Sequence, residues 1–234
     1  MIEVLYEDNH CLVLNKPAGL LAQGDETGEA SALDLAREYV RTKYNKPGNV
    51  YLGLVHRLDR PTSGVLLLAR TSKAAARLSE QFREGTVRKV YWAVVEGRCP
   101  YESGDWVDTL RKDGAENVVS VVPEGTPGGR LATLGFRVLE RTPSAAWLEV
   151  RPTTGRGHQI RVQLASRGLP ILGDRKYGGA ERVLAADGKP RIGLHARELS
   201  FQHPTRPEEV SVTAPVPEDW PWPPAGARPG RRSS

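Results

Sequence analysis

Residues 54–70, "LVHRLDRPTSGVLLLAR", place several charged side chains between two apolar runs that each predict a strand. Side chains alternate along a strand, so Arg57 and Asp59 are expected to point the same way. Pro61 prevents regular strand pairing, and Gly64 permits a sharp bend. An ionised carboxylate held beside cations on such a bend could attack a substrate or stabilise a cation. The spacing alone nevertheless favours the alternative, a solvated turn between two strands.

Two further segments carry groups that could bind an anion or a base. In "TTGRGHQIRVQ", Arg156 and His158 precede a predicted helix, and Arg161 lies one turn inside it. Helix N-termini with nearby arginines bind phosphate or carboxylate, although a helix cap with solvated basic side chains explains the pattern equally well. Tyr91 lies in the apolar alternation of "KVYWAV", which favours a core position. An aromatic face for a stacked base is the alternative.

The elements that must position these residues follow from hydrophobic periodicity and turn signals. Helices are predicted to begin at Ser31, where Ser31 and Asp34 resemble a capping box, and at Ser72, with Gly85 as its stop. A short helix is predicted over 158–168. Residues 100–129 are polar and are interpreted as an excursion from the core with a short hairpin. The segments predicted as strands are 2–6, 10–15, 50–55, 65–69, 88–97, 131–140, 145–152, 193–204 and 208–215. Strands outnumber helices and short polar turns join them, so the predicted class is α+β with mostly antiparallel pairing.

Composition narrows the class of protein. The chain has 234 residues, a formal net charge of +5 and no apolar run near the roughly 20 residues that span a membrane. The positive charge favours an anionic partner, most commonly nucleic acid. Cys11 and Cys99 are the only cysteines and form no CxxC, which argues against disulfides and structural zinc. The five histidines lack metalloprotease spacing, and no nucleotide fingerprint is present. We therefore expect a cytoplasmic monomer without membrane contact, metal or cofactor.

Several motifs, in order, resemble those of one family. The segment "HRLDRPTSG" closely resembles the signature of the RluA-type pseudouridine synthases. "LVLNKPAGLL" resembles the opening strand and turn of that family, and "RKVYWAVVEG" its "K-x-Y-x-A-x-V-x-G" strand. "PTTGRGHQIRVQLASRGLPILGDRKYGG" and "LHARELSFQHP" resemble its later signatures. The resemblance covers roughly residues 4–215, and the succession of motifs makes it far more specific than any one of them.

The resemblance implies a fold and roles for the candidate residues. The fold is a mixed, mostly antiparallel sheet split by a central catalytic cleft and flanked by a few helices. Asp59 matches the catalytic aspartate, Tyr91 the tyrosine that stacks on uracil, and Arg161 the basic residue paired with the aspartate. Arg57 matches an arginine that holds RNA with the base extruded. The predicted RNA-binding residues are Arg57, His56, Arg60, Thr62, Arg156 and His158.

The implied activity is isomerisation of specific uridines in ribosomal or transfer RNA. The bond from uracil N1 to ribose C1′ breaks and C5 joins C1′, which requires neither metal nor cofactor. Uracil is stacked in folded RNA, so it must be flipped out, at a cost of a few kcal/mol that RNA contacts offset. Two alternatives are an inactive RNA-binding protein of this fold and a base-excising glycosidase. Glycosidases usually use two carboxylates, and the resemblance assigns a catalytic role to only one, Asp59.

Three features depart from the family pattern. An RNA-binding S4 module often precedes this domain, and we expect none here because the sequence opens directly on the catalytic core. Gln163 replaces a histidine that many members have. The segment 218–234 is rich in Pro, Gly and Arg, so we predict a disordered tail after a catalytic domain at residues 1–217.

Overall fold

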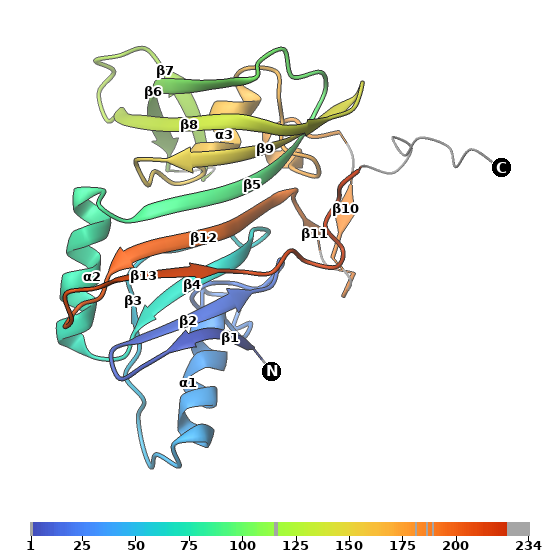
Figure 1. The fold of residues 1–234 in the computed structure, drawn as a ribbon. Coiled ribbons are helices and arrows are strands. Elements are labelled where there is room, and N and C mark those ends of the chain that lie inside the picture. Colours follow the sequence, from blue (N-terminus) through green and yellow to red (C-terminus); the bar gives the residue numbers. More distant parts are fainter. Residues whose placement is uncertain (1, 115–116, 181, 186, 189, 224–234) are drawn as a thin grey trace. The chain divides into compact units, whose positions relative to one another are not determined.

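A computed structural model describes residues 2–114, 117–180, 182–185, 187–188 and 190–223. The chain forms two compact units (Figure 1). Unit 1 comprises Met1–Tyr91 and His195–Val216, and unit 2 comprises Trp92–Leu194 and Pro217–Ser234. The chain first passes between them inside strand β5 (Arg88–Glu96). The residues predicted to form one catalytic domain, 1–217, thus contribute to both units.

Unit 1 is built on a mixed sheet. Its strands are β1 (Glu3–Glu7), β2 (Cys11–Lys16), β3 (Gly53–Leu54), β4 (Ser63–Ala69), β12 (Leu194–Gln202) and β13 (Glu209–Thr213). Strand β1 pairs with β2, β2 with β4, β3 with β4 and β12 with β13, all antiparallel, whereas β4 pairs with β12 in parallel. The strand predicted over 50–55 is shorter than expected, since only Gly53 and Leu54 pair with β4.

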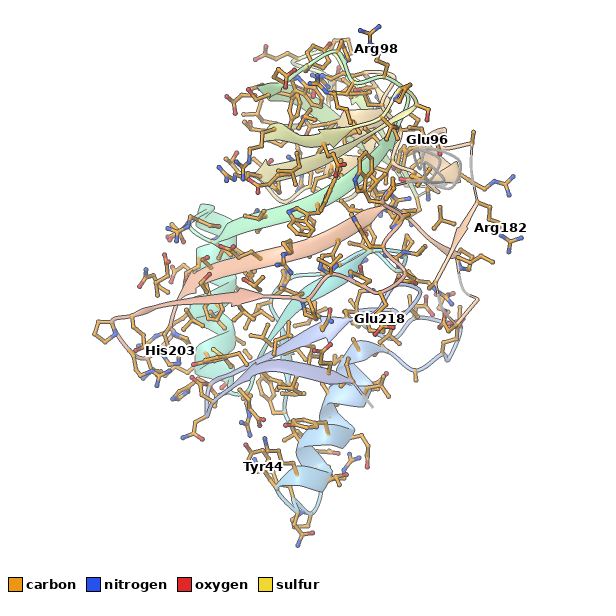
Figure 2. All side chains as sticks on the ribbon, turned by 45° about the vertical axis from the view of Figure 1, so that its right-hand side comes forward. Tyr44, Glu96, Arg98, Arg182, His203 and Glu218 are labelled. Carbon is orange, nitrogen blue, oxygen red and sulfur yellow. The ribbon has the colours of Figure 1, made fainter. Side chains whose placement is uncertain are left out.

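Both faces of β2 and β4 are buried, which explains the continuous apolar run "VLLLA" in β4. Helix α1 (Ala32–Lys43) packs with Leu66 and Leu68 in one cluster, and α2 (Ser72–Glu84) packs with Leu67 in another. The predicted capping box at Ser31 begins α1, and Tyr44 is the C-cap that follows its last residue, Lys43 (Figure 2). The left-handed Gly85 ends α2, also as predicted.

Unit 2 holds an antiparallel sheet in the order β9–β8–β6–β7 (Figure 1). Its elements are β6 (Ser103–Asp113), β7 (Val118–Val122), β8 (Arg130–Arg141), β9 (Ala145–Pro152), β10 (Val183–Leu184), β11 (Pro190–Arg191), α3 (Gln159–Ala165) and a 3-10 helix, η1 (Arg175–Tyr177). The hairpin predicted within 100–129 is confirmed as β6 and β7. The interpretation of the segment as an excursion was wrong, because β6 also pairs with β8 along eight residues. The polar composition of β6 did not indicate a strand because one face of β6, with Asp105 and Val107, is exposed. Leu110 on the opposite face is buried.

The segment after residue 217 begins with packed structure. Trp220 and Trp222 lie against Trp147, with ring centroids 6.4 and 6.1 Å away. Arg191 pairs with Asp219. Residues 218–223 therefore pack within unit 2, because two large aromatic rings bury more surface than the Pro- and Gly-rich composition suggests. Residues 224–234 lie outside the described residues, so disorder there stays a prediction.

No helix among the described residues is both long enough and apolar enough to cross a membrane.

Candidate active site

Asp59 lies half-buried on a short, closed turn in front of β4. The backbone N–H of Thr62 donates to the Asp59 carbonyl at 3.0 Å, and β4 begins at the next residue. Arg60 ties this turn to Gly19, because the Gly19 N–H donates to the Arg60 carbonyl at 2.8 Å and the Arg60 Nε donates to the Gly19 carbonyl at 3.0 Å. The predicted bend is thus a turn fixed by hydrogen bonds on both sides.

Gly64 is required where β4 approaches β12. Its φ is +112°, and a Cβ at this position would lie 2.2 Å from the carbonyl oxygen of Ala196. A side chain would therefore force apart the parallel strands that follow the Asp59 turn.

Lys16, which the sequence analysis did not single out, is fully buried beneath the same turn. Its Nζ donates to the carbonyls of Pro17 at 3.0 Å, Leu20 at 2.7 Å and Arg60 at 3.2 Å. Burial lowers the pKa of Lys16 to about 7, against the opposing attraction of the Asp59 carboxylate. The sequence signal was the lysine in "NKPAG", where an apolar strand ends on a charge.

Tyr91 belongs to unit 1 with Asp59 and packs on the cluster that contains Leu52 and Leu58. Burial raises the pKa of its phenol, and the Asp59 carboxylate raises it further. The phenol is therefore neutral at physiological pH. The two alternatives for Tyr91 are compatible here, because the ring is half-buried at the edge of a core and electrostatically coupled to Asp59.

The other candidates near Asp59 differ in exposure. Arg57 is exposed, and Arg60 pairs with Glu29 at 2.6 Å. Thr62 is only 2% exposed. His56 accepts a hydrogen bond at Nε2 from the Leu67 N–H at 2.9 Å, and its ring stacks on a phenylalanine ring of α2 at 4.6 Å.

Burial, together with the Lys89 cation, lowers the pKa of His56 to about 3, so its imidazole is neutral. Thr62 is thus buried and His56 is half-buried in this conformation. Their predicted RNA contacts stay predictions, because packing against the chain itself occupies them.

Unit 2 positions the second group of candidates. Arg161 in α3 is buried and forms two hydrogen bonds with Asp174, from Nε at 2.7 Å and from Nη2 at 2.8 Å. His158, whose φ is +53°, precedes α3, and its Nδ1 lies 2.6 Å from the Tyr177 hydroxyl. Arg156 donates from Nε to a backbone carbonyl of β8. The sequence analysis missed Asp174 and Tyr177, although both lie in the quoted segment "GDRKYGG".

The nine predicted site residues therefore fall into two groups. Asp59 and Tyr91 lie in unit 1 with Arg57, His56, Arg60 and Thr62, whereas Arg156, His158 and Arg161 lie in unit 2. The pairing of Arg161 with Asp59 stays a prediction.

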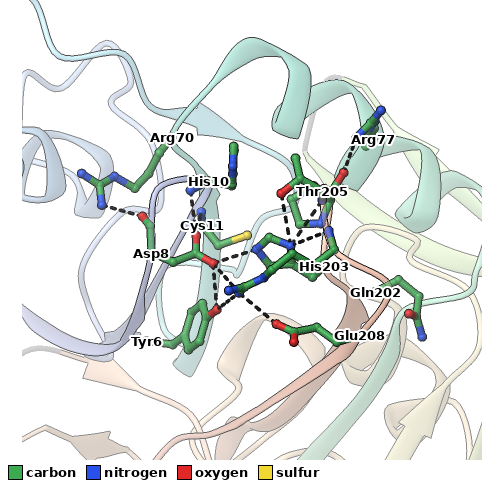
Figure 3. A network of polar contacts seen from close by, with 12 residues as sticks. Tyr6, Asp8, His10, Cys11, Arg70, Arg77, Gln202, His203, Thr205 and Glu208 are labelled. Atoms are coloured by element: carbon green, nitrogen blue, oxygen red, sulfur yellow. Dashed lines mark hydrogen bonds and ion pairs between the residues drawn. The ribbon is translucent and has the colours of Figure 1, made fainter.

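One cluster of potential metal ligands lies in unit 1, at the turns after β1 and β12 (Figure 3). The donor atoms of Asp8, Cys11 and His203 lie within 4.8 Å of one another. Nδ1 of His203 accepts hydrogen bonds from the backbone N–H groups of Thr205 and Arg206, at 3.3 and 3.1 Å. Nε2 therefore carries the proton of the neutral ring and contacts the Asp8 carboxylate at 2.7 Å.

A metal-bound histidine usually donates a hydrogen bond from its other ring nitrogen, whereas Nδ1 of His203 faces donors. The cluster thus fits a metal poorly and instead joins two turns. Burial of Asp8 raises the pKa of its carboxyl, but hydrogen bonds from the backbone of His10 and Cys11 and from the side chains of Tyr6 and His203 outweigh this effect. The pKa of Asp8 falls to about 2.

Comparison with known proteins identifies the same family as the sequence motifs. The RNA pseudouridylate synthase family matches residues 10–166. Ribosomal large subunit pseudouridine synthase C of Escherichia coli (strain K12) is 39% identical over 222 residues, which are 92% of this chain and 66% of that protein. Ribosomal large subunit pseudouridine synthase C of Vibrio vulnificus (strain CMCP6) is 36% identical over 220 residues, with the same coverage. The chain spans slightly less than two thirds of the length of these two relatives.

Solved structures agree with the sequences. Human RNA Pseudouridylate Synthase Domain Containing 4 has a TM-score of 0.76 and 27% identity, over 93% of this chain and 90% of that one. Human RNA Pseudouridylate Synthase Domain Containing 1 has a TM-score of 0.70 and 26% identity, over 93% and 84%. The predicted α+β class with a mixed, mostly antiparallel sheet is confirmed. The chain belongs to the RNA pseudouridylate synthase family.

Proposed function

We propose that this chain isomerises specific uridines in RNA to pseudouridine, with Asp59 as the catalytic carboxylate. The observation that carries the proposal is the placement of Asp59. Its turn is closed by the Thr62 hydrogen bond, tied to Gly19 and supported by the buried Lys16. Catalysis depends on holding a reactive group in one geometry, and this turn supplies such a geometry.

The reaction balances within the substrate. The N1–C1′ bond breaks, the uracil turns, C5 bonds to C1′, the hydrogen on C5 leaves as a proton, and N1 takes up a proton, so the formula is unchanged. Asp59 either attacks C1′ as a nucleophile or abstracts the C2′ proton to give a glycal. In both routes the carboxylate acts on the sugar in its ionised form.

The remaining candidate residues hold the RNA and the extruded base. Tyr91 offers a half-buried ring for the uracil to stack on, which offsets part of the cost of flipping. Arg161 pairs with Asp59 and keeps it ionised. Arg57, which is exposed, contacts the RNA strand, and Arg60, Arg156 and His158 contribute further positive or polar surface.

The relatives named above act on the RNA of the large ribosomal subunit, so we propose ribosomal RNA as the first substrate to test, and transfer RNA as the second. We further propose a cytoplasmic monomer that needs neither metal nor cofactor. Activity on C5-tritiated RNA in the presence of chelator and without added nucleotide tests the last point.

The central experiment substitutes Asp59→Asn, which keeps the shape and removes the charge. Tritium release from RNA labelled at uridine C5 reports turnover, because pseudouridine and uridine have the same mass. We expect turnover to fall at least ~10³-fold, about 4 kcal/mol of barrier, with RNA affinity changed less than ~10-fold. Substantial tritium release by Asp59→Asn, with deamidation excluded, removes Asp59 from this role.

The same assay separates the two alternatives. Release of free uracil by the wild type indicates a base-excising glycosidase. Tight RNA binding without either tritium or uracil release, on total RNA from cells that lack the gene, indicates an RNA-binding protein of this fold without activity.

A further inference from the structure

Arg161 is held on two sides by one short segment of unit 2. Asp174 accepts hydrogen bonds from Nε and Nη2 along one edge of the guanidinium. The guanidinium carbon lies over the ring of Tyr177, 5.0 Å from the ring centroid. The side chains of Arg161 and Asp174 are 6% and 1% exposed, so little water competes for these contacts. A planar guanidinium that is bonded along one edge by a carboxylate and also contacts an aromatic ring has a defined orientation.

The segment that carries Asp174 is itself rigid. The Asp174 carbonyl accepts hydrogen bonds from the N–H groups of Tyr177 and Gly179, at 3.0 and 2.9 Å, and its own N–H donates to Ile171. A Cβ at Gly179 would lie 2.7 Å from the Ile171 carbonyl oxygen, so the turn is close-packed.

The hydroxyl of Tyr177 is fixed as well. It lies 2.6 Å from His158 Nδ1 and accepts a hydrogen bond from the Val119 N–H at 3.0 Å. The hydroxyl has one O–H and two lone pairs, so it can bond to both partners at once. The ring against Arg161 is therefore anchored to β7 and to the start of α3.

We propose that Asp174 is a positioning residue for the reaction, which fixes the direction of Arg161 with the help of Tyr177. The inference rests on the proposed function, in which Arg161 pairs with Asp59. Asp174 occupies the edge formed by Nε and Nη2, an edge that does not include Nη1. A guanidinium has five N–H donors, so one arginine can serve two carboxylates from two edges.

Removal of the charge on Asp174 should disturb both the position of the Arg161 side chain and the electrostatic interaction that holds it. In Asp174→Asn, only the amide oxygen accepts, and its NH₂ group faces a guanidinium N–H donor. Arg161 then loses one of two bonds and gains a repulsive contact, so its flexible side chain adopts other rotamers. A shift of about 1 Å in a catalytic partner can lower turnover about 100-fold.

Unit 2 offers a matched control. Asp108 also accepts two hydrogen bonds from an arginine, Arg167, at 2.9 and 3.1 Å. Arg167 likewise stacks on an aromatic ring, that of Trp106, at 4.3 Å. This pair is also an arginine–aspartate pair and contains no predicted site residue, although Asp108 accepts a further hydrogen bond from Gln163 at 2.7 Å and the pair is more exposed. Asp108→Asn thus measures the effect of breaking such a pair where it serves stability alone.

The test compares the two variants by thermal unfolding, RNA affinity and single-turnover tritium release. We expect Asp174→Asn to lower turnover about 100-fold with RNA affinity within ~3-fold of the wild type. Asp108→Asn should lower the melting temperature similarly yet keep turnover within ~3-fold. Asp174→Glu, which keeps both acceptors on a longer stem, should recover part of the loss. The proposal is overturned if folded Asp174→Asn retains turnover within ~3-fold, or if Asp108→Asn loses as much.

A second measurement is independent of turnover. In ¹⁵N-labelled protein, the Nε–H signal of Arg161, assigned with Arg161→Lys, should exchange slowly with water in the wild type and in Asp108→Asn. It should exchange rapidly in Asp174→Asn. Unchanged exchange overturns the positioning role. A wild type without tritium release but with this NMR pattern contradicts the proposed function and leaves Asp174 as the residue that orients Arg161.

Discussion

Gly64→Ala tests whether the approach of β4 to β12 supports the candidate site. The added Cβ would lie 2.2 Å from the carbonyl oxygen of Ala196 and 2.7 Å from its carbonyl carbon. An ordinary contact is about 3.4 Å or more, so the backbone must move by about 1 Å. That movement opens the parallel pairing of Ser63 and Gly64 with His195 and Ala196.

Two contributions set the magnitude. A residue with a side chain at a φ of +112° is strained by about 1–3 kcal/mol. Overpacking against backbone adds about 1–3 kcal/mol. We therefore expect Gly64→Ala to lower the free energy of unfolding by about 4 kcal/mol, or the melting temperature by about 8–16 °C. Turnover should also fall, because β4 begins directly after the Asp59 turn.

Gly128→Ala is the control for backbone strain alone. Gly128 has a φ of +77°, and a Cβ there meets nothing within 4 Å. It should lower the free energy of unfolding by only about 1–2 kcal/mol. Urea denaturation of both variants gives the difference, which isolates the contact with Ala196. If the two variants lose the same stability, the close approach of the strands has no energetic consequence and the reasoning is wrong.

Four further results are expected. RNA binding should weaken with salt, with a log–log slope of about 0.7 for each phosphate contacted on single-stranded RNA; an affinity that salt leaves unchanged contradicts electrostatic binding. The pKa of Asp8 is lowered to about 2, so the folded state binds this proton less tightly than the unfolded state. The lowered pKa of Asp8 should add about 1–2 kcal/mol to the free energy of unfolding, after allowance for solvent screening; this stabilisation should be present above pH 4 and lost as the pH falls toward 2. Acid unfolding of Asp8→Asn should lack that loss of stability. Arg161→Ala leaves Asp174 buried without its cation and should cost about 3–5 kcal/mol in urea denaturation, whereas an unchanged midpoint would show that the pair is not needed for folding. A chain that ends after Pro223 should match the full chain in stability and turnover, whereas one that ends after Pro217 should melt earlier yet keep its turnover; lost turnover would make the segment a functional arm.

Local sequence determined much of the fold. The serine and aspartate of the capping box lie three residues apart and satisfy each other at the start of α1, and Gly85 ends α2 because it adopts a positive φ without a steric penalty. The run "VLLLA" predicted a buried strand, since both faces of β4 are covered. The order of motifs identified the family and placed Asp59 on its turn. These features depend on residues that are neighbours along the chain.

Tertiary structure decided the properties of side chains whose partners are distant in the sequence. Lys16 reads locally as the charged end of a strand, and only its contact with the carbonyl of Arg60, 44 residues away, makes it part of the Asp59 turn. The sequence predicted His56 only as an RNA-binding residue, and the structure shows that packing lowers the pKa of its imidazole and makes it an acceptor for a β4 backbone N–H. Arg161 and Asp174 are separated by 13 residues, and the turn between them brings their side chains into a buried pair. Burial and charge pairing are properties of the folded chain, so the sequence by itself determined which groups are present, and the tertiary structure decided their charge, their direction and their partners.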